Sequence, residues 1–171
     1  MGFGNNETFK TNLLKEFKKL GIDASRIIFA KRVAEMRDHL ARYKLADLFL
    51  DTFPYNAHTT SMDSLKAGVP VLTLISKSFA GRVAASLLNA IGLPSLIRTS
   101  QDEYESLAIQ LGKNPDQLTV IKKQLAENHS TMPLFDTPLF TKHIESAYSM
   151  MMNRHWSNLP PEHLHVSPQE L

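Results

Sequence analysis

A short polar segment near the middle of the chain carries the side chains best suited to chemistry. His58, Thr59 and Thr60 follow a loop rich in turn-forming residues, and Asp63 comes one helical turn later. Threonine and serine are favoured N-cap residues, so we expect Thr59, Thr60 or Ser61 to be the N-cap of a helix. The unpaired N–H groups and the dipole at such a helix start stabilise an anion. The spacing therefore predicts an anion site, for which a phosphate is the obvious occupant.

The same residues also fit a purely structural role, in which the threonines cap a helix and His58 forms hydrogen bonds within its loop. Other catalytic patterns are missing from the sequence. No glycine-rich dinucleotide fingerprint or G-x-S-x-G motif occurs, and Asp47 and Asp51 bracket an apolar run instead of pairing on one face of a helix. Dinucleotide enzymes and hydrolases are poor fits for this chain.

Two apolar runs flank the polar segment and indicate the elements that position it. Residues 48–50 and 70–75 are continuously apolar or nearly so, which predicts strands buried on both faces inside a sheet. Gly68 lies where the intervening helix should end, because glycine readily adopts the left-handed conformation required there.

Strands and helices are predicted to alternate along the rest of the chain. Further strands are expected at 26–30 and 93–98. Helices are expected from Asn5 or Asn6 to residue 20, at 35–45 with Met36, Leu40 and Tyr43 facing inward, at 79–91, from Ser100 with a capping box, from Asn114, and from Thr137. This alternation predicts an α/β fold with a parallel, Rossmann-like sheet and helices on both faces. Loops 31–34, 52–60 and 76–78 should then converge at the carboxyl edge of the sheet.

The central segment also carries a family resemblance. The string DTFPYNAHTTSMDSLKAGVPVLTL, followed by GRVAASLL, resembles the C-terminal catalytic lobe of protein O-linked N-acetylglucosaminyltransferases and their bacterial relatives. The similarity runs from about Asp23 to Tyr148. It implies the C-terminal half of a two-lobed GT-B glycosyltransferase that transfers a sugar from a nucleotide, with inversion and without a metal ion or cofactor, to Ser or Thr of an acceptor protein.

The resemblance also implies which residues hold the donor. In this family the His-Thr-Thr motif, here His58, Thr59 and Thr60, lies against the pyrophosphate and sugar. The carboxylate that holds the ribose matches Asp63. The family's phosphate-binding lysine, its acceptor-binding lobe and the groups proposed as general base match nothing in this chain, so we expect the chain to be a fragment of the catalytic region.

Base recognition in the family uses the segment that matches residues 33–39. The resemblance implies contact through the backbone of Ala34 and stacking of His39 on the base. The family's base-contacting lysine falls at Met36, and Arg37 or Lys31 can take its place. This departure leaves the base open. UDP-N-acetylglucosamine is the expected donor, while the DTFPY portion also resembles relatives that use GDP-fucose.

Length and composition set the remaining expectations. A chain of 171 residues suits one domain, and we expect a nucleotide-sugar-binding lobe at 5–153 and a loose, proline-broken tail at 154–171. The final helix has an apolar stripe that includes Leu139, Ile144, Tyr148 and Met151. We expect this stripe to contact the other lobe, or to cause self-association in its absence.

The surroundings of the protein are predicted from charge, cysteine content and hydropathy. A net charge of +2 gives no reason to expect nucleic acid or a membrane surface as partner. The chain has no cysteine and no long apolar run, so a soluble, cytoplasmic protein is expected.

A second function stays open beside the glycosyltransferase. In this alternative the chain is a lobe that binds nucleotide or a partner protein without catalysis.

Overall fold

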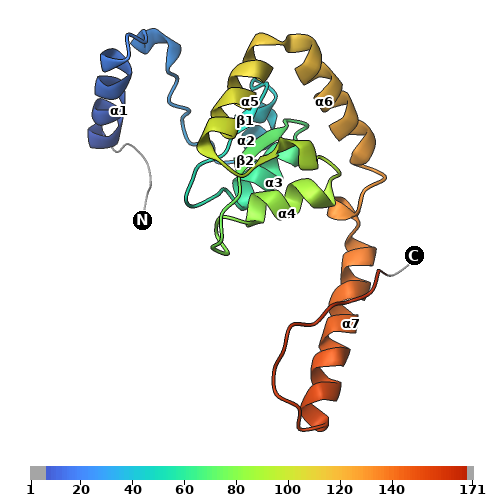
Figure 1. Cartoon of the computed structure of the whole chain (residues 1–171). Coiled ribbons are helices and arrows are strands. Elements are labelled where there is room, and N and C mark those ends of the chain that lie inside the picture. The colour runs from blue at the N-terminus through green and yellow to red at the C-terminus, as the bar shows by residue number, and fades with distance from the viewer. Residues whose placement is uncertain (1–6, 169–171) are drawn as a thin grey trace. The chain divides into compact units, whose positions relative to one another are not determined.

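The computed structural model describes residues 7–168, which fall into two units that divide at Met1–His39 and Leu40–Leu171 (Figure 1). The division lies inside helix α2, Met36–Tyr43. The predicted helix start at Asn5 or Asn6 lies outside the described residues.

The first unit contains helix α1, Glu7–Lys19, and a 3₁₀ turn, η1, Ala24–Arg26. Gly21 follows α1 with φ +70°, which confirms it as the helix stop. The strand predicted at 26–30 is wrong. Asp23 caps η1 by accepting from the N–H of Ser25 at 2.9 Å, and the apolar run after it pairs with no described strand, leaving Ile28 88% exposed. Met36 is also 62% exposed, so its predicted inward orientation is wrong.

The second unit is built on a three-stranded parallel sheet in the order β1-β2-β3. The strands are β1, Phe49–Leu50, β2, Val71–Leu74, and β3, Ile97–Arg98, with Phe49 opposite Val71 and Thr73 opposite Ile97. The central strand β2 is buried as predicted. β1 is instead an edge strand, and Leu50 is 53% exposed, so the prediction that 48–50 is buried on both faces is wrong.

The third strand is shorter than the apolar pattern predicts. Pro94 opens a 3₁₀ turn, η2, Pro94–Leu96, because proline pre-sets the backbone for a turn and cannot donate to a strand ladder. Only the last two residues of the predicted strand 93–98 pair with β2. Leu96 is still buried, so the apolar pattern reports burial here and not extended structure.

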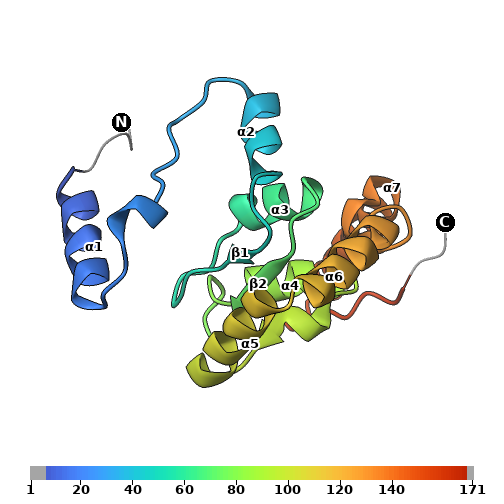
Figure 2. The same cartoon turned by 90° about the horizontal axis from the view of Figure 1, so that it is seen from above.

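Helices cover this small sheet (Figure 2). α3, Thr59–Lys66, α4, Val83–Ala90, and α5, Gln101–Lys113, each pack against β2, and α6, Pro115–Asn128, packs against α5. Ala84 and Ala85 of α4 are buried, and their small side chains allow this helix to pack closely. The core draws on all of these elements: Leu65, Val71, Leu72, Leu88, Ile91, Leu93, Leu96, Leu107, Leu111 and Leu125. This arrangement confirms the predicted α/β class.

The C-terminal part of the second unit consists of a 3₁₀ turn, η3, Pro133–Phe135, and helix α7, Thr137–Trp156. No residue of α7 is buried. Residues 157–168 have no regular structure and return alongside α7 (Figure 1), where the guanidinium of Arg154 donates to Glu162 and to the backbone oxygen of Pro160. The boundary expected between 153 and 154 stays a prediction. None of the helices within 7–168 combines the length and the apolar character needed to cross a membrane.

Candidate functional site

The start of α3 lies at the carboxyl end of β1, as the sequence predicts. The N-cap is His58, with φ −107° and ψ −88° and no side-chain cap, so the assignment of the cap to a threonine or serine is wrong by one residue. Thr59 and Thr60 are exposed in the first turn. Within the described part of the chain, the N–H groups of Thr59, Thr60 and Ser61 donate to no loop or cap oxygen. The helix start is therefore open to an anion.

The loop before α3 is held by the buried carboxylate of Asp51, which is 3% exposed. Its Oδ1 accepts from the N–H of Thr52 at 2.9 Å and from the N–H of Ala57 at 2.7 Å. Its Oδ2 accepts from the hydroxyl of Thr73, on β2, at 2.6 Å. One side chain thus ties both ends of the loop to the neighbouring strand.

Burial raises the pKa of Asp51, and the hydrogen bonds from Thr73, Ala57 and Thr52 oppose that rise. The backbone oxygen of Asp51 accepts from the hydroxyl of Tyr104, on α5, at 2.9 Å. Burial and then the charge of Asp51 raise the pKa of Tyr104 to about 12, so this phenol stays a hydrogen-bond donor at neutral pH.

Asn56 links the same loop to the next one. It is 1% exposed, and its side-chain NH₂ donates to the backbone oxygens of Thr52 at 2.8 Å and Leu74 at 3.3 Å. Its backbone N–H donates to the backbone oxygen of Ala80 at 3.1 Å. Loops 52–60 and 76–78 and their flanks therefore meet at the carboxyl edge of β1 and β2, as predicted. Loop 31–34 was expected at this edge because a strand was predicted before it. No described strand precedes this loop, which belongs to the first unit, so that reasoning is wrong.

The loop after β2 is built tightly around a glycine. Gly81 accepts from the N–H of Ser76 at 2.8 Å and donates to the hydroxyl of Ser78 at 3.0 Å. A Cβ placed on Gly81 would lie 1.8 Å from the Ser76 hydroxyl oxygen, so no larger residue fits without a shift of this loop. The helix predicted at 79–91 begins only at Val83, because residues 79–82 form this turn.

His58 is half-buried between the two loops. Its ring stacks on Tyr55, with centroids 5.1 Å apart, and meets the edge of Phe79 at 5.9 Å. Its Nε2 lies 3.4 Å from the backbone oxygen of Ala80. Tyr55 and Phe79 are largely exposed, so the histidine ring is fixed by side chains that also border the open helix start.

Asp63 lies in the second turn of α3 and is half-buried. Burial, followed by the charge of Asp63, raises the pKa of the Tyr43 phenol. That phenol donates to the backbone oxygen of Thr60 at 3.4 Å. The structure therefore brings together four of the predicted residues, His58, Thr59, Thr60 and Asp63, within one helix and its cap.

The other three predicted residues belong to the first unit. Ala34 is exposed in the segment before α2. Arg37 lies in the first turn of α2, with its side chain 86% exposed and its Nε 3.7 Å from Asp38. His39 follows on the same helix and is half-buried. Their role in base recognition stays a prediction.

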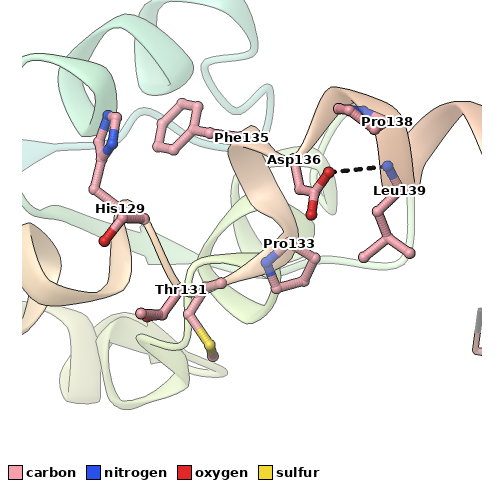
Figure 3. A pocket seen from close by; sticks show the side chains of 9 residues that line it. His129, Thr131, Pro133, Phe135, Asp136, Pro138 and Leu139 are labelled. Carbon is pink, nitrogen blue, oxygen red and sulfur yellow. Dashed lines mark hydrogen bonds between the residues drawn. The ribbon is translucent and has the colours of Figure 1, made fainter. Parts of the chain in front are cut away.

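A hollow of about 530 Å³ lies elsewhere, where α6 leads through η3 into α7 (Figure 3). His129 stacks on Phe135 there, with centroids 4.3 Å apart, and the carboxylate of Asp136 accepts from the N–H of Leu139 at 2.9 Å. Its lining has no lysine or arginine and does contain a carboxylate. This hollow is therefore unsuited to a phosphate, and the open start of α3 remains the better candidate. Residues 7–168 form no cluster of three or more His, Asp or Glu that could hold a metal ion.

Comparison with known proteins decides the family. The profile described as Glycosyl transferase family 41 matches residues 6–144. The chain belongs to glycosyl transferase family 41. The match includes the sheet, the Asp51 loop, α3 and every predicted site residue. The resemblance drawn from the central motif is thereby confirmed.

Individual members of glycosyl transferase family 41 agree with this assignment. The probable UDP-N-acetylglucosamine-peptide N-acetylglucosaminyltransferase SEC of Arabidopsis thaliana is 41% identical over 152 residues. The UDP-N-acetylglucosamine-peptide N-acetylglucosaminyltransferase of Caenorhabditis elegans is 38% identical over 144 residues. A solved mutant of the Thermobaculum terrenum O-GlcNAc transferase superposes with a TM-score of 0.76 at 33% identity, over 83% of this chain and 27% of that one. This likeness confirms the GT-B type fold.

The shared region is a small part of the relatives. It covers 88% of this chain but 16% of the Arabidopsis protein, and 84% of this chain but 12% of the Caenorhabditis protein. Sequence reasoning within this region missed three residues that shape the site, namely Asp51, Asn56 and Tyr104. For Asp51 the sequence does contain a signal, because the aspartate comes directly after an apolar strand. A carboxylate buried there needs hydrogen-bond donors from the surrounding protein.

Proposed function

We propose that this chain is the nucleotide-sugar-binding part of an inverting, metal-independent protein O-glycosyltransferase, with UDP-N-acetylglucosamine as donor and Ser or Thr hydroxyls as acceptors. The observation that carries the proposal is the open start of α3 after His58, within a region 41% identical to a probable UDP-N-acetylglucosamine-peptide N-acetylglucosaminyltransferase. Such a helix start is built to receive a diphosphate.

In the proposed mechanism the chain binds and stabilises the leaving group. As the bond to the sugar breaks, negative charge grows on the diphosphate, and the N–H groups of Thr59 and Thr60 point toward it from the positive end of α3. His58 lies against the same anion with its ring orientation fixed by Tyr55 and Phe79. Asp63, one turn further on, accepts from the ribose hydroxyls.

The donor base is assigned to the segment that contains Ala34, Arg37 and His39. In the proposed complex His39 stacks on the base, and the backbone of Ala34 reads its edge. Met36 stands where related proteins have a base-contacting lysine, and Arg37, with its side chain 86% exposed, is available for that contact. A comparison of UDP with GDP therefore tests the choice between UDP-N-acetylglucosamine and GDP-fucose.

Calorimetry and thermal shift with a ligand series test this function. We expect the chain to bind UDP weakly, equally well in EDTA and in magnesium, with affinity falling from UDP to UMP to uridine as phosphates are removed. Roughly 1.5 to 3 kcal/mol of binding energy should be missing relative to a site with the family's phosphate-binding lysine, because that lysine matches no residue of this chain. GDP should bind less tightly than UDP.

Three results would contradict the proposal. They are strict dependence of UDP binding on a divalent metal, no binding of UDP at about 1 mM, where an interaction worth about 4 kcal/mol is half saturated, and equal binding of uridine and UDP. Nucleotide binding by the chain, combined with no sugar transfer after the rest of the protein is supplied, would favour the non-catalytic alternative.

A further inference from the structure

The carboxylate of Asp51 lies next to the candidate site but forms its hydrogen bonds within the protein. Asp51 is 3% exposed, and its two oxygens are used by Thr52, Ala57 and Thr73. Burying an ionised carboxylate is costly unless it is hydrogen-bonded, and removing it would leave the buried hydroxyl of Thr73 without its acceptor. The presence of an aspartate at position 51 is explained if its carboxylate fixes the geometry of the loop before α3.

The bonds of Asp51 cross between elements whose relative positions define the site. Ala57 immediately precedes His58, and Thr73 lies on β2 just before the second loop. The carboxylate thereby holds the turn into α3 against the neighbouring strand. Tyr104 adds a bond from α5 to the backbone oxygen of Asp51, which fixes the end of β1 itself.

Asn56 supplies a second brace in the same loop. Its side chain joins Thr52 to Leu74, and its backbone joins Ala80. Because both braces are buried, water cannot easily replace their hydrogen bonds, and the two loops at the helix start should move together. Groups that bind an anion work best when they are held in place before the ligand arrives.

We propose that Asp51 is a positioning residue of the anion site, whose carboxylate holds the Ala57–His58 turn against Thr73 and so aims the first N–H groups of α3. This inference rests on the proposed function, since it concerns the site at which the diphosphate binds. Asp51 touches neither donor nor acceptor. Its effect is carried by the orientation of His58 and Thr59.

The experiment compares four variants of the 171-residue chain. Thr73→Val removes the hydroxyl donor with little change in size, Thr73→Ser restores it, and Asp51→Ala removes the carboxylate. Leu118→Ala, in α6, is the matched control, because Leu118 is buried and takes part in none of the hydrogen bonds that hold Asp51. Affinities for UDP and inorganic pyrophosphate are measured by calorimetry well below the lowest melting temperature, and amide exchange is followed at Ala57 and at Leu72.

We expect Thr73→Val and Asp51→Ala to weaken UDP and pyrophosphate alike, by about tenfold, the lower end of the losses measured when the hydrogen-bond partners behind metal ligands are replaced. Exchange at Ala57 should accelerate while exchange at Leu72 does not. Thr73→Ser should restore both the ligand affinities and the slow amide exchange at Ala57. Leu118→Ala should lower the melting temperature yet leave both affinities within about twofold of the parent chain.

The outcomes separate the two claims. If the parent chain binds UDP and pyrophosphate while Thr73→Val and Asp51→Ala bind them equally well, the positioning role is overturned and the proposed function is untouched. An equal loss of affinity in Leu118→Ala also overturns it, because general loosening then explains the effect. If the parent chain binds neither ligand, the proposed function fails first and the positioning role fails with it.

Discussion

Asp51 and Asp63 are carboxylates on either side of His58, and their surroundings give them different tasks. Asp51 is buried, and both of its oxygens are used within the protein. Asp63 is only half-buried, in the second turn of a helix whose start is open. A ligand hydroxyl can reach the second carboxylate and not the first. This contrast allows the two residues to be tested separately.

The ribose contact proposed for Asp63 predicts a loss that depends on the ligand. Asp63→Ala should weaken UDP by about 1.5 to 3 kcal/mol, the typical worth of a hydrogen bond to a charged group, and leave inorganic pyrophosphate almost unaffected. Titration calorimetry with both ligands measures the difference.

Asp116→Ala serves as the control for Asp63→Ala, because it removes the same charge from the first turn of α6. It should change neither affinity. If Asp63→Ala weakens UDP and pyrophosphate equally, the ribose contact is disproved and Asp63 has a structural role.

Asp51 should also leave a signature in the pH dependence of stability. Because burial raises its pKa in the folded state, the folded chain holds this proton more tightly than the unfolded chain does. The resulting stability is fully present below the ordinary aspartate pKa and is lost as pH rises through the folded pKa. Urea unfolding across a pH series should therefore show the parent chain losing stability relative to Asp51→Asn over that window.

Glu103→Gln provides a comparison of opposite sign. Hydrogen bonds from Thr99, ahead of those from Ser100, lower the pKa of Glu103. The stability that Glu103 contributes is present above the ordinary glutamate pKa. It is lost as pH falls through the pKa of Glu103 in the folded state. Slopes of the same sign for the Asp51 and Glu103 pairs would contradict this assignment.

Two helices of the second unit begin in opposite ways. At the start of α5, Ser100 accepts from the N–H of Glu103 at 3.3 Å, and the Glu103 carboxylate accepts from the N–H groups of Thr99 and Ser100, forming the predicted capping box. At the start of α3, His58 provides no side-chain cap. The N–H groups at the start of α5, which we assign a structural role, are therefore capped by side chains. Those at the start of α3, which we assign to binding, have no side-chain cap.

Removing the α5 cap should reduce stability without touching the anion site directly. Ser100→Ala is expected to lower the free energy of unfolding by about 1 kcal/mol, the usual cost of losing a serine N-cap. Ser130→Ala is the matched control, since its hydroxyl makes only a 3.5 Å contact with the backbone oxygen of Glu127. Urea unfolding of both variants measures the difference, and equal losses would contradict a capping role.

Helices and turns with explicit local signals could be predicted from the sequence. The capping box at Ser100, the glycine stop at Gly68 with φ +84°, and the buried strand β2 all agree with the structure. At the candidate site, the loop–helix transition at 58–60 was predicted to within one residue. The capping box and the glycine stop depend on interactions within a few residues of sequence, and the apolar run of β2 signals its burial directly.

Features that depend on distant partners could not be predicted. An apolar run such as 26–30 forms a strand only if another strand lies beside it, and the run itself carries no record of that neighbour. The edge position of β1 has the same origin. The brace at Asp51 escaped notice because Thr73 and Tyr104, its partners, lie 22 and 53 residues away.

At the scale of the whole molecule, the long helix α7 exposes apolar side chains along its length. None of its residues is buried, and Tyr148 and Met151 are 61% and 53% exposed. A long helix with this much apolar surface usually contacts something else. We expect the chain alone to self-associate, and Tyr148→Lys to reduce that association in analytical ultracentrifugation, with Lys142→Glu as a control on the same helix that should not.

The chain should transfer no sugar by itself. Catalysis requires donor and acceptor to be held together, which is worth about 7 to 11 kcal/mol, and the chain corresponds to 16% of a relative that would hold both. Transfer to a peptide acceptor is assayed with the chain alone and with the remaining catalytic region supplied. Robust transfer by the chain alone would show that the chemistry lies within these residues.

The bond from Tyr104 to Asp51 also has a consequence for the order in which the protein matures. It spans 53 residues, so the ribosome must release α5 before the loop ahead of α3 acquires its last support. A nascent chain that ends between Gly92 and Ser100 already contains His58, Thr59 and Thr60, but it lacks Tyr104, whose hydroxyl bonds the backbone oxygen of Asp51. Full competence to bind should therefore appear only after Tyr104 has been translated, 53 residues beyond Asp51.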